Sequence, residues 1–186
     1  MLRITPKLLD GTLRFASPIG AMLIFLFLII LIDTETSARD LLFLPAYMFP
    51  PFGKESIIPI AIARGVNPLI VSSSIIALDS LTAVFLALNF NLLYSLPFFG
   101  NLIKKFEKVG NKTLERRKWI KRFSTLGLLL FMLIPFQGTG AISTSLIGRL
   151  AGVDVYRVVL AVFAGSILTT VTLTFFSGLV RSLFTG

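Results

Sequence analysis

The sequence predicts an all-α integral membrane protein, and three observations point to that class. Hydrophobic residues occupy 55% of the 186 positions, whereas soluble domains are ~45–50% apolar. The charged residues gather in a few stretches that separate long apolar runs. Two of these runs are broken by prolines and glycines, which end helices. We therefore expect helical hairpins that enter and leave the membrane on one face, in addition to helices that cross it.

Composition excludes several classes of function. The chain has no cysteine and no histidine, so it can form no disulfide, no thiolate metal site and no histidine base. An intramembrane aspartyl protease needs two catalytic acids, and the sequence contains no Gly-x-Gly-Asp motif. We therefore expect neither an enzyme nor a bound metal or other cofactor.

A single membrane domain, 1–186, is expected to have four parts. The first part contains the uncharged run Ser17–Ile32, which is short for a bilayer that takes roughly 17–25 residues to cross. We interpret this run as a retained span, since no small-x-small cleavage site follows it. The parts are an N-terminal helix and span (1–40), a first repeat (41–90), a basic amphipathic linker (91–122) and a second repeat (123–186).

Two further spans are predicted, at Leu69–Phe90 and Val155–Leu183. Asn67 and Pro68 precede the first of them, as N-cap and first helical residue. The region 91–100 is expected to be irregular.

The distribution of charge predicts the orientation, because basic flanks tend to stay cytoplasmic. Residues 1–15 hold three bases and one acid, residues 104–122 nine bases and two acids, and residues 33–40 three acids and one base. The N-terminus and the linker then lie in the cytoplasm. Segment 41–63 must enter and leave on the outer face, and segment 126–150 on the inner face. We expect a multi-pass protein of the cell membrane with an extracytoplasmic C-terminus.

A weak internal repeat supports this topology. The sequence PFGK at 51–54 resembles PFQG at 135–138, and IARGVN at 62–67 resembles LAGVD at 150–154, with offsets of 84 and 87 residues. Each half would be a broken hairpin followed by a span, which is the inverted-repeat architecture of many transporters. Chance similarity between apolar segments is the alternative.

Broken backbone inside a bilayer must be buried in protein or line a wet cavity. Two hairpin tips that meet near the midplane would satisfy this condition, and their free N–H groups could bind an anion. Gly138 and Gly140 would allow close approach of backbone to a ligand. The residues expected to form the hairpins are Pro50, Pro51, Gly53, Pro59 and Pro135.

Three charged residues are candidates for the site. Glu55 is expected to be a proton carrier or cation ligand, unless Lys54 and Glu55 form a solvated pair at a loop tip. Asp79 lies near the centre of its span, where a charge costs ~2.5–3.5 kcal/mol on insertion scales. It is either functional or a structural acid capped by hydroxyl neighbours such as Ser80 and Thr82.

Three arginines and several neutral residues complete the candidates. Arg64, Arg149 and Arg157 are either counter-charges for the acids and an anion, or interfacial anchors. The neutral lining would be Gln137, Thr139, Ser143 and Thr144. Ser72–Ser74 is expected to serve helix packing through small residues.

Two stretches resemble a known family. PFGKESIIPIAIARGVNP at 51–68 and IPFQGTGAISTSLIGRLAGVD at 134–154 are similar to the two motifs of the small multidrug export protein family. This family looks related to the DedA (VTT-domain-like) group, which has opposed re-entrant hairpins and is linked to lipid-carrier transport or scrambling. The resemblance implies a role for membrane acids near the first hairpin and for arginines after the second, matching Glu55, Asp79, Arg149 and Arg157.

The function expected is that of a proton-coupled transporter for an amphipathic or anionic substrate, such as a lipid-linked phosphate carrier. A lipid scramblase without ion coupling and a non-transporting assembly subunit are the alternatives. The basic residues of 104–122 would contact anionic lipid headgroups, and we expect no nucleic-acid binding. A homodimer is expected, because three spans offer little shelter to two hairpins.

Overall fold

The computed structural model describes residues 6–32, 53–95, 124–134 and 140–185. All regular structure in these residues is helical, as expected, and the seven helices are α1 (Pro6–Ile32), α3 (Lys54–Ala63), α4 (Pro68–Leu88), α5 (Phe90–Ser95), α8 (Ser124–Leu133), α9 (Ala141–Leu150) and α10 (Val155–Thr185). Residues 33–52 and the part of the predicted basic linker from 96 to 122 lie outside the described residues.

Two helices are long and apolar enough to cross a membrane, Pro68–Leu88 in α4 and Val155–Val180 in α10. Both lie where the sequence predicted spans. In α1 the corresponding apolar stretch is shorter, Phe15–Phe25, so a crossing by α1 stays a prediction. The region 91–100 was expected to be irregular, but α5 makes a short helix at its start because Asn89 caps α4 and the chain turns directly into a new helix.

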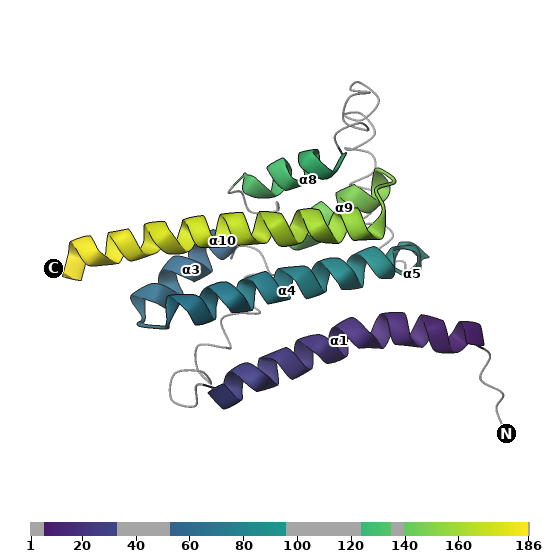
Figure 1. The fold of residues 1–186 in the computed structure, drawn as a ribbon, viewed down its shortest axis with the longest axis horizontal. Helices are drawn as coiled ribbons and strands as arrows, with labels where there is room; N and C mark the ends of the chain where they lie inside the picture. The colour runs from purple at the N-terminus through teal and green to yellow at the C-terminus, as the bar shows by residue number, and fades with distance from the viewer. Residues whose placement is uncertain (1–5, 33–52, 96–123, 135–139, 186) are drawn as a thin grey trace.

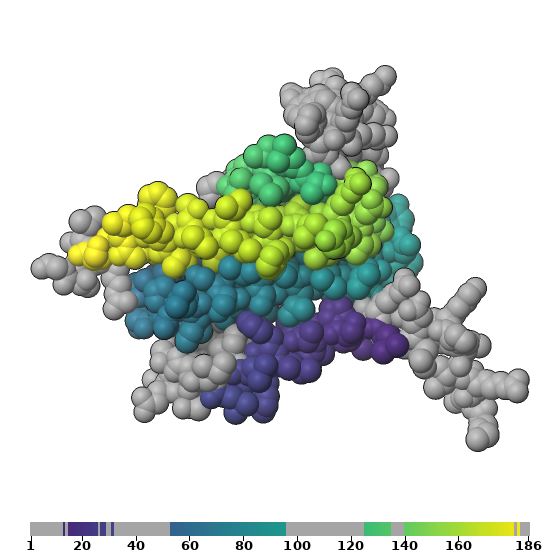
Figure 2. All heavy atoms as spheres, in the orientation of Figure 1, coloured from purple at the N-terminus to yellow at the C-terminus, as the bar shows by residue number. Residues whose placement is uncertain are grey.

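The helices α4 and α10 form the centre of the molecule. They lie side by side and run in opposite directions (Figure 1). α1 covers one side of α4, and α8 lies on the far side of α10 (Figure 2). α3 packs on α10 near the end where α4 begins, whereas α9 packs on α4 near the end where α10 begins.

The helices α3, α8 and α9 have ten residues each. Such a helix is about 15 Å long, half of the roughly 30 Å hydrocarbon core. None of the three can cross a membrane alone. Pro59, expected to help form the hairpin break, lies inside α3 instead. It removes one backbone hydrogen bond and crowds the preceding turn, but the helix continues to Ala63. α3 begins at Lys54, directly after Gly53, whose backbone is extended.

The turns that follow α3 and α9 have the same hydrogen bonds. After α3, Gly65 N–H donates to Ile62 O and Val66 N–H to Ala61 O; after α9, Gly152 donates to Arg149 and Val153 to Gly148. Both glycines have positive φ, 92° and 76°, as a helix end closed by the Schellman motif requires. Corresponding residues are 87 apart throughout, and so are the N-caps Gly53 and Gly140. The 84-residue offset is therefore not the register of the described segments.

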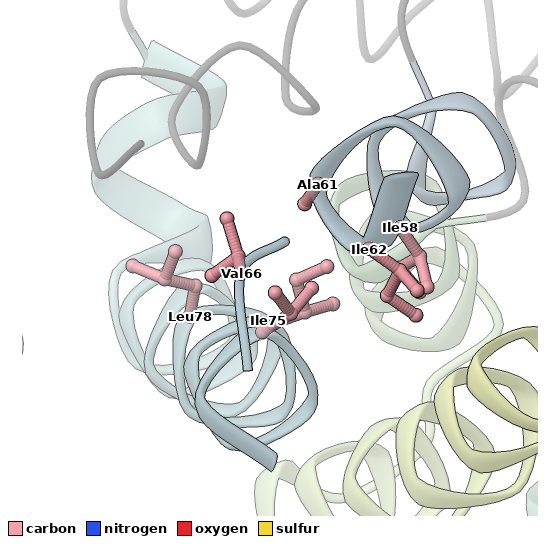
Figure 3. Packing of buried hydrophobic residues seen from close by; sticks show 7 residues of the cluster. Ile58, Ala61, Ile62, Val66, Ile75 and Leu78 are labelled. Carbon is pink, nitrogen blue, oxygen red and sulfur yellow. The ribbon is translucent and has the colours of Figure 1, made fainter. Parts of the chain in front are cut away.

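The core lies between these short and long helices. Ile58 and Ile62 of α3 face Ile75 of α4, with Val66 of the turn beside them (Figure 3). On the other side, a Cβ on Gly165 of α10 would lie 2.9 Å from Met132 of α8, so the glycine permits close helix packing.

Large apolar side chains are exposed on the outer faces of the helices, which suits contact with lipid. Examples are Leu23, Ile24 and Phe27 of α1, Leu126 and Leu130 of α8, and Phe163, Phe175 and Phe176 of α10.

Candidate functional site

A buried ion pair lies where α3, α4 and α10 meet. Lys54 Nζ is 3.1 Å from Asp79 Oδ2, and the two side chains are 7% and 0% exposed. Ser166 Oγ donates to the same carboxylate oxygen at 2.6 Å. Because each charge is desolvated, each one depends on its partner. The three side chains form one polar group inside an apolar core.

Helix geometry brings these residues together. Lys54 is the first residue of α3, whose N-cap Gly53 makes no side-chain capping bond. Asp79 is the twelfth residue of α4 and Ser166 the twelfth of α10. The predicted cap of α4 is confirmed, since Asn67 Oδ1 accepts from Leu69 N–H at 2.9 Å and Pro68 is the first helical residue. Asp79 lies on the side of α4 that faces α10, as its contact with Ser166 shows.

Glu55 is not paired with Lys54 in a solvated loop, because Lys54 bonds Asp79 instead. The Glu55 carboxylate folds back over Gly53, where a Cβ would overlap it. Its Oε2 atom is buried and has no hydrogen-bond partner among the described residues. Gly53 is thus needed to make room for this carboxylate at the start of α3.

Hydroxyl groups extend along α10 from the ion pair. Ser166, Thr170 and Thr174 are spaced by four residues and so share one face of the helix. Thr174 Oγ1 is 2.8 Å from Ser72 Oγ of α4. Thr170 is fully buried, and its Oγ1 has no partner in the described part of the chain.

The start of α9 carries a second group of hydroxyls. Ser143, Thr144 and Ser145 are all buried, following the N-cap Gly140. Their helix packs on α4 and α10, whereas α3 packs mainly on α10. The other predicted tip residues, Gln137, Gly138, Thr139 and Pro135 in the second half and Pro50 and Pro51 in the first, lie outside the described residues.

The arginines lie apart from the ion pair, so the counter-charge of Asp79 is Lys54. Arg64 is exposed at the end of α3. Arg157 is 3.7 Å from Asp154, and both side chains are more than half exposed. Arg149 donates to the Val153 carbonyl at 2.8 Å and lies 5.8 Å from the centre of the Phe90 ring. These contacts are typical of helix-end anchors.

A hydroxyl from another helix binds Asp79. Ser166 Oγ of α10 donates to its carboxylate, whereas Ser80 Oγ, one of the neighbours considered as a cap, bonds the Ile76 carbonyl of its own helix. The sequence did not point to Ser166 or Thr170. If the two halves of the sequence had been aligned with an offset of 87 residues, Ser166 would have been paired with Asp79. Within the described residues, no three acidic side chains gather as a metal site would require.

The family comparison covers most of this site. The family described as "Putative small multi-drug export protein" matches residues 56–172, a stretch that contains Asp79, Ser166 and Thr170. No curated protein and no solved structure shows significant similarity to the chain. Because the match extends over well more than half of the sequence, the chain belongs to the small multi-drug export protein family.

Proposed function

We propose that this protein, a membrane transporter by its family, couples substrate movement to protons at the Lys54–Asp79–Ser166 site. The observation that carries the proposal is the fully buried ion pair between α3 and the centre of α4. Structural stability alone is a weak reason for such a pair, since apolar residues of similar volume stabilise a core equally well or better. Intramembrane ionisable residues mark transport pathways by default.

Electroneutrality suggests the coupling. The Lys54–Asp79 pair carries no net charge, and a net charge in a low-dielectric site is costly. An anionic group that displaces Asp79 from Lys54 therefore favours uptake of one proton by Asp79. Ser166, which donates to the ionised carboxylate, can turn its hydroxyl to accept from the protonated one. One proton would accompany each negative charge of the substrate.

An amphipathic anion fits the surroundings of this pair. The start of α3 has backbone N–H groups without intrahelical acceptors, and its N-cap adds no side-chain bond. Apolar side chains such as Ile58 and Leu78 are buried in the same region. A substrate with a negative head and an apolar body, for example a lipid-linked phosphate, combines both features. This substrate class also agrees with the proposed relationship to the DedA group.

We further propose that the chain is an inverted-topology repeat with two re-entrant hairpins. The support is the equal hydrogen bonding of the two turns, 87 residues apart, and the opposite directions of α4 and α10 (Figure 1). The half-length helices α3 and α9 would be the returning arms of the hairpins. The N-terminus would be cytoplasmic and the C-terminus extracytoplasmic in the cell membrane, and two copies would form a homodimer.

Proton flux in reconstituted vesicles tests the coupling. Farnesyl phosphate is the anionic probe, and a pH-sensitive dye inside the vesicles reports protons. We expect probe-dependent acidification with the unchanged protein and none with Asp79→Asn. Ser177→Ala, which removes a hydroxyl bonded only to its own helix at Leu173, is the matched control. Equal flux in Asp79→Asn and the unchanged protein would refute the coupling role.

The same vesicles separate the competing functions. Tetraphenylphosphonium, an organic cation, would instead drive protons outward if it competed with Lys54 for Asp79. Movement of a fluorescent phospholipid between leaflets without proton flux would identify a scramblase. No movement of any probe would favour an assembly subunit.

Cysteine labelling tests the topology, since the chain has no cysteine of its own. Arg64→Cys and Asp154→Cys place single thiols at exposed positions in the two turns. An impermeant reagent should label Arg64→Cys from outside the cell and Asp154→Cys only from the cytoplasm. Labelling of both from one side would exclude the inverted repeat.

A further inference from the structure

We infer that the hydroxyls of Ser166, Thr170 and Thr174 form a hydrated path that brings protons to Asp79 from one end of the molecule only. This end is the one with the α3–α4 turn. The inference rests on the proposed function and adds to it the direction of proton access. Apart from Ser166, it concerns residues of α10 and α4 that the proposed function does not use.

Spacing determines how such a path can work. Residues four apart on a helix are about 6 Å apart along its axis, twice the length of an O–H···O bond of about 2.7–2.8 Å. One water between successive hydroxyls would therefore complete a hydrogen-bonded chain. The unpartnered Thr170 Oγ1 is the group that such a water would satisfy, since buried hydroxyls are rarely left without a partner.

The exposure of the hydroxyl residues increases from Ser166 toward Thr174, as a path from solvent to Asp79 requires. Ser166 and Thr170 are fully buried, whereas Thr174 and its partner Ser72 are partly exposed. The hydroxyls thus lead from solvent-accessible residues to the carboxylate of Asp79.

The opposite direction along the same two helices is apolar. Four and eight residues before Ser166 lie Val162 and Val158, both fully buried. Four and eight residues after Asp79 lie Ala83 and Ala87, which are 0% and 1% exposed. Aliphatic side chains offer no hydrogen bond to water, so α4 and α10 themselves provide no hydroxyl path on this half.

Ionisable groups near the line are few. α3 contributes Lys54 and Glu55, and α4 contributes Asp79 alone. α10 has no ionisable residue between Arg157 and Arg181, and α1 has none from Phe15 to Ile32. Arg64 is exposed in the α3–α4 turn, at the entrance to the line. A proton that continues along the hydroxyls reaches the Lys54–Asp79 pair.

Single cysteines test the path without any need for transport. Thr170→Cys and Thr174→Cys lie on the line, and Ala83→Cys and Ala87→Cys are their counterparts 87 residues earlier, on the half where α4 and α10 carry aliphatic side chains. A small, water-soluble methanethiosulfonate should modify Thr174→Cys fastest, Thr170→Cys more slowly, and the two alanine-site cysteines hardly at all. Modification of Thr170→Cys no faster than of Ala83→Cys would overturn the path.

Proton flux gives a second readout with isosteric variants. Thr170→Val removes the hydroxyl without changing the side-chain shape, and loss of one hydrogen-bonded link of about 1.4 kcal/mol corresponds to about tenfold slower flux. Thr169→Val is the matched control, because its hydroxyl bonds the Gly165 carbonyl. Equal flux in the two variants would contradict the path even where Asp79→Asn abolishes coupling. The cysteine variants could be labelled as predicted while Asp79→Asn keeps its full probe-dependent proton flux. That result would support the path but refute the proposed coupling at Asp79.

Discussion

Asp79 and Ser166 are 87 residues apart and meet through a 2.6 Å hydrogen bond. The same 87 residues separate the turns after α3 and α9. In the proposed inverted repeat Asp79 and Ser166 occupy equivalent positions of two antiparallel helices, and such positions can meet only at the point about which the pair is symmetric. The carboxylate and the hydroxyl therefore lie at the centre of the α4–α10 contact, with the charge on one half and a neutral donor on the other.

Removal of one partner of the ion pair is expected to destabilise the protein strongly. Lys54→Met leaves Asp79 buried without a counter-charge, which costs about 3–5 kcal/mol. Thermal unfolding in detergent measures the loss as a lower Tm. The double variant Lys54→Met/Asp79→Asn should recover most of it, because no isolated charge remains. A double variant as unstable as the sum of the single variants would show that the pair is not coupled.

Ser166→Ala should lower the free energy of unfolding by about 1.5–3 kcal/mol, since it removes a hydrogen bond to a charged group. Denaturant titration in detergent is the measurement. Ser182→Ala is the control, because that exposed hydroxyl bonds the Leu179 carbonyl of its own helix, and it should change stability by less than about 0.5 kcal/mol. Equal effects of the two variants would mean that the contact with Asp79 contributes nothing.

Gly165→Ala should destabilise the packing of α10 on α8 by about 1–3 kcal/mol. The added methyl group would lie 2.9 Å from the Met132 side chain. Gly127→Ala in α8 is the matched control, because its Cβ would meet no atom within 4 Å. Thermal unfolding should show a lower Tm only for Gly165→Ala, and Met132→Ala should relieve part of the loss.

Gly65→Ala and Gly152→Ala should each cost roughly 1–2 kcal/mol, because both positions need the left-handed conformation. Similar losses in thermal unfolding are expected for the two, as their turns have the same hydrogen bonds. Gly20→Ala in α1, which would meet no atom within 4 Å and has a helical backbone, should be neutral or stabilising. Very different losses at 65 and 152 would argue that the two turns are not equivalent.

Local patterns in the sequence predicted most of the described helices. The apolar runs gave α4 and α10, and Asn67–Pro68 gave the start of α4 to the residue. The position of these helices could be predicted because it depends on residues close together in the sequence. The N-terminal helix and the span predicted within 1–40 form one continuous helix, α1, from Pro6 to Ile32.

The site was predicted only in part because its contacts are between distant residues. Asp79 and Lys54 were both candidates, but nothing local indicates that residues 25 positions apart form an ion pair. Ser166 is one of several hydroxyl residues on α10, and only the packing of α10 on α4 distinguishes it. The roles of the arginines were left open, and their contacts near helix ends follow from where α9 and α10 begin and stop.

The position of the Asp79–Ser166 contact near the middle of α4 and α10 has a mechanical consequence. When one rod tilts against the other, atoms at the pivot move least and atoms at the tips move most. A tilt of α4 against α10 about the Asp79–Ser166 contact would thus move the two helices apart at one end and together at the other. The carboxylate of Asp79 would stay almost stationary.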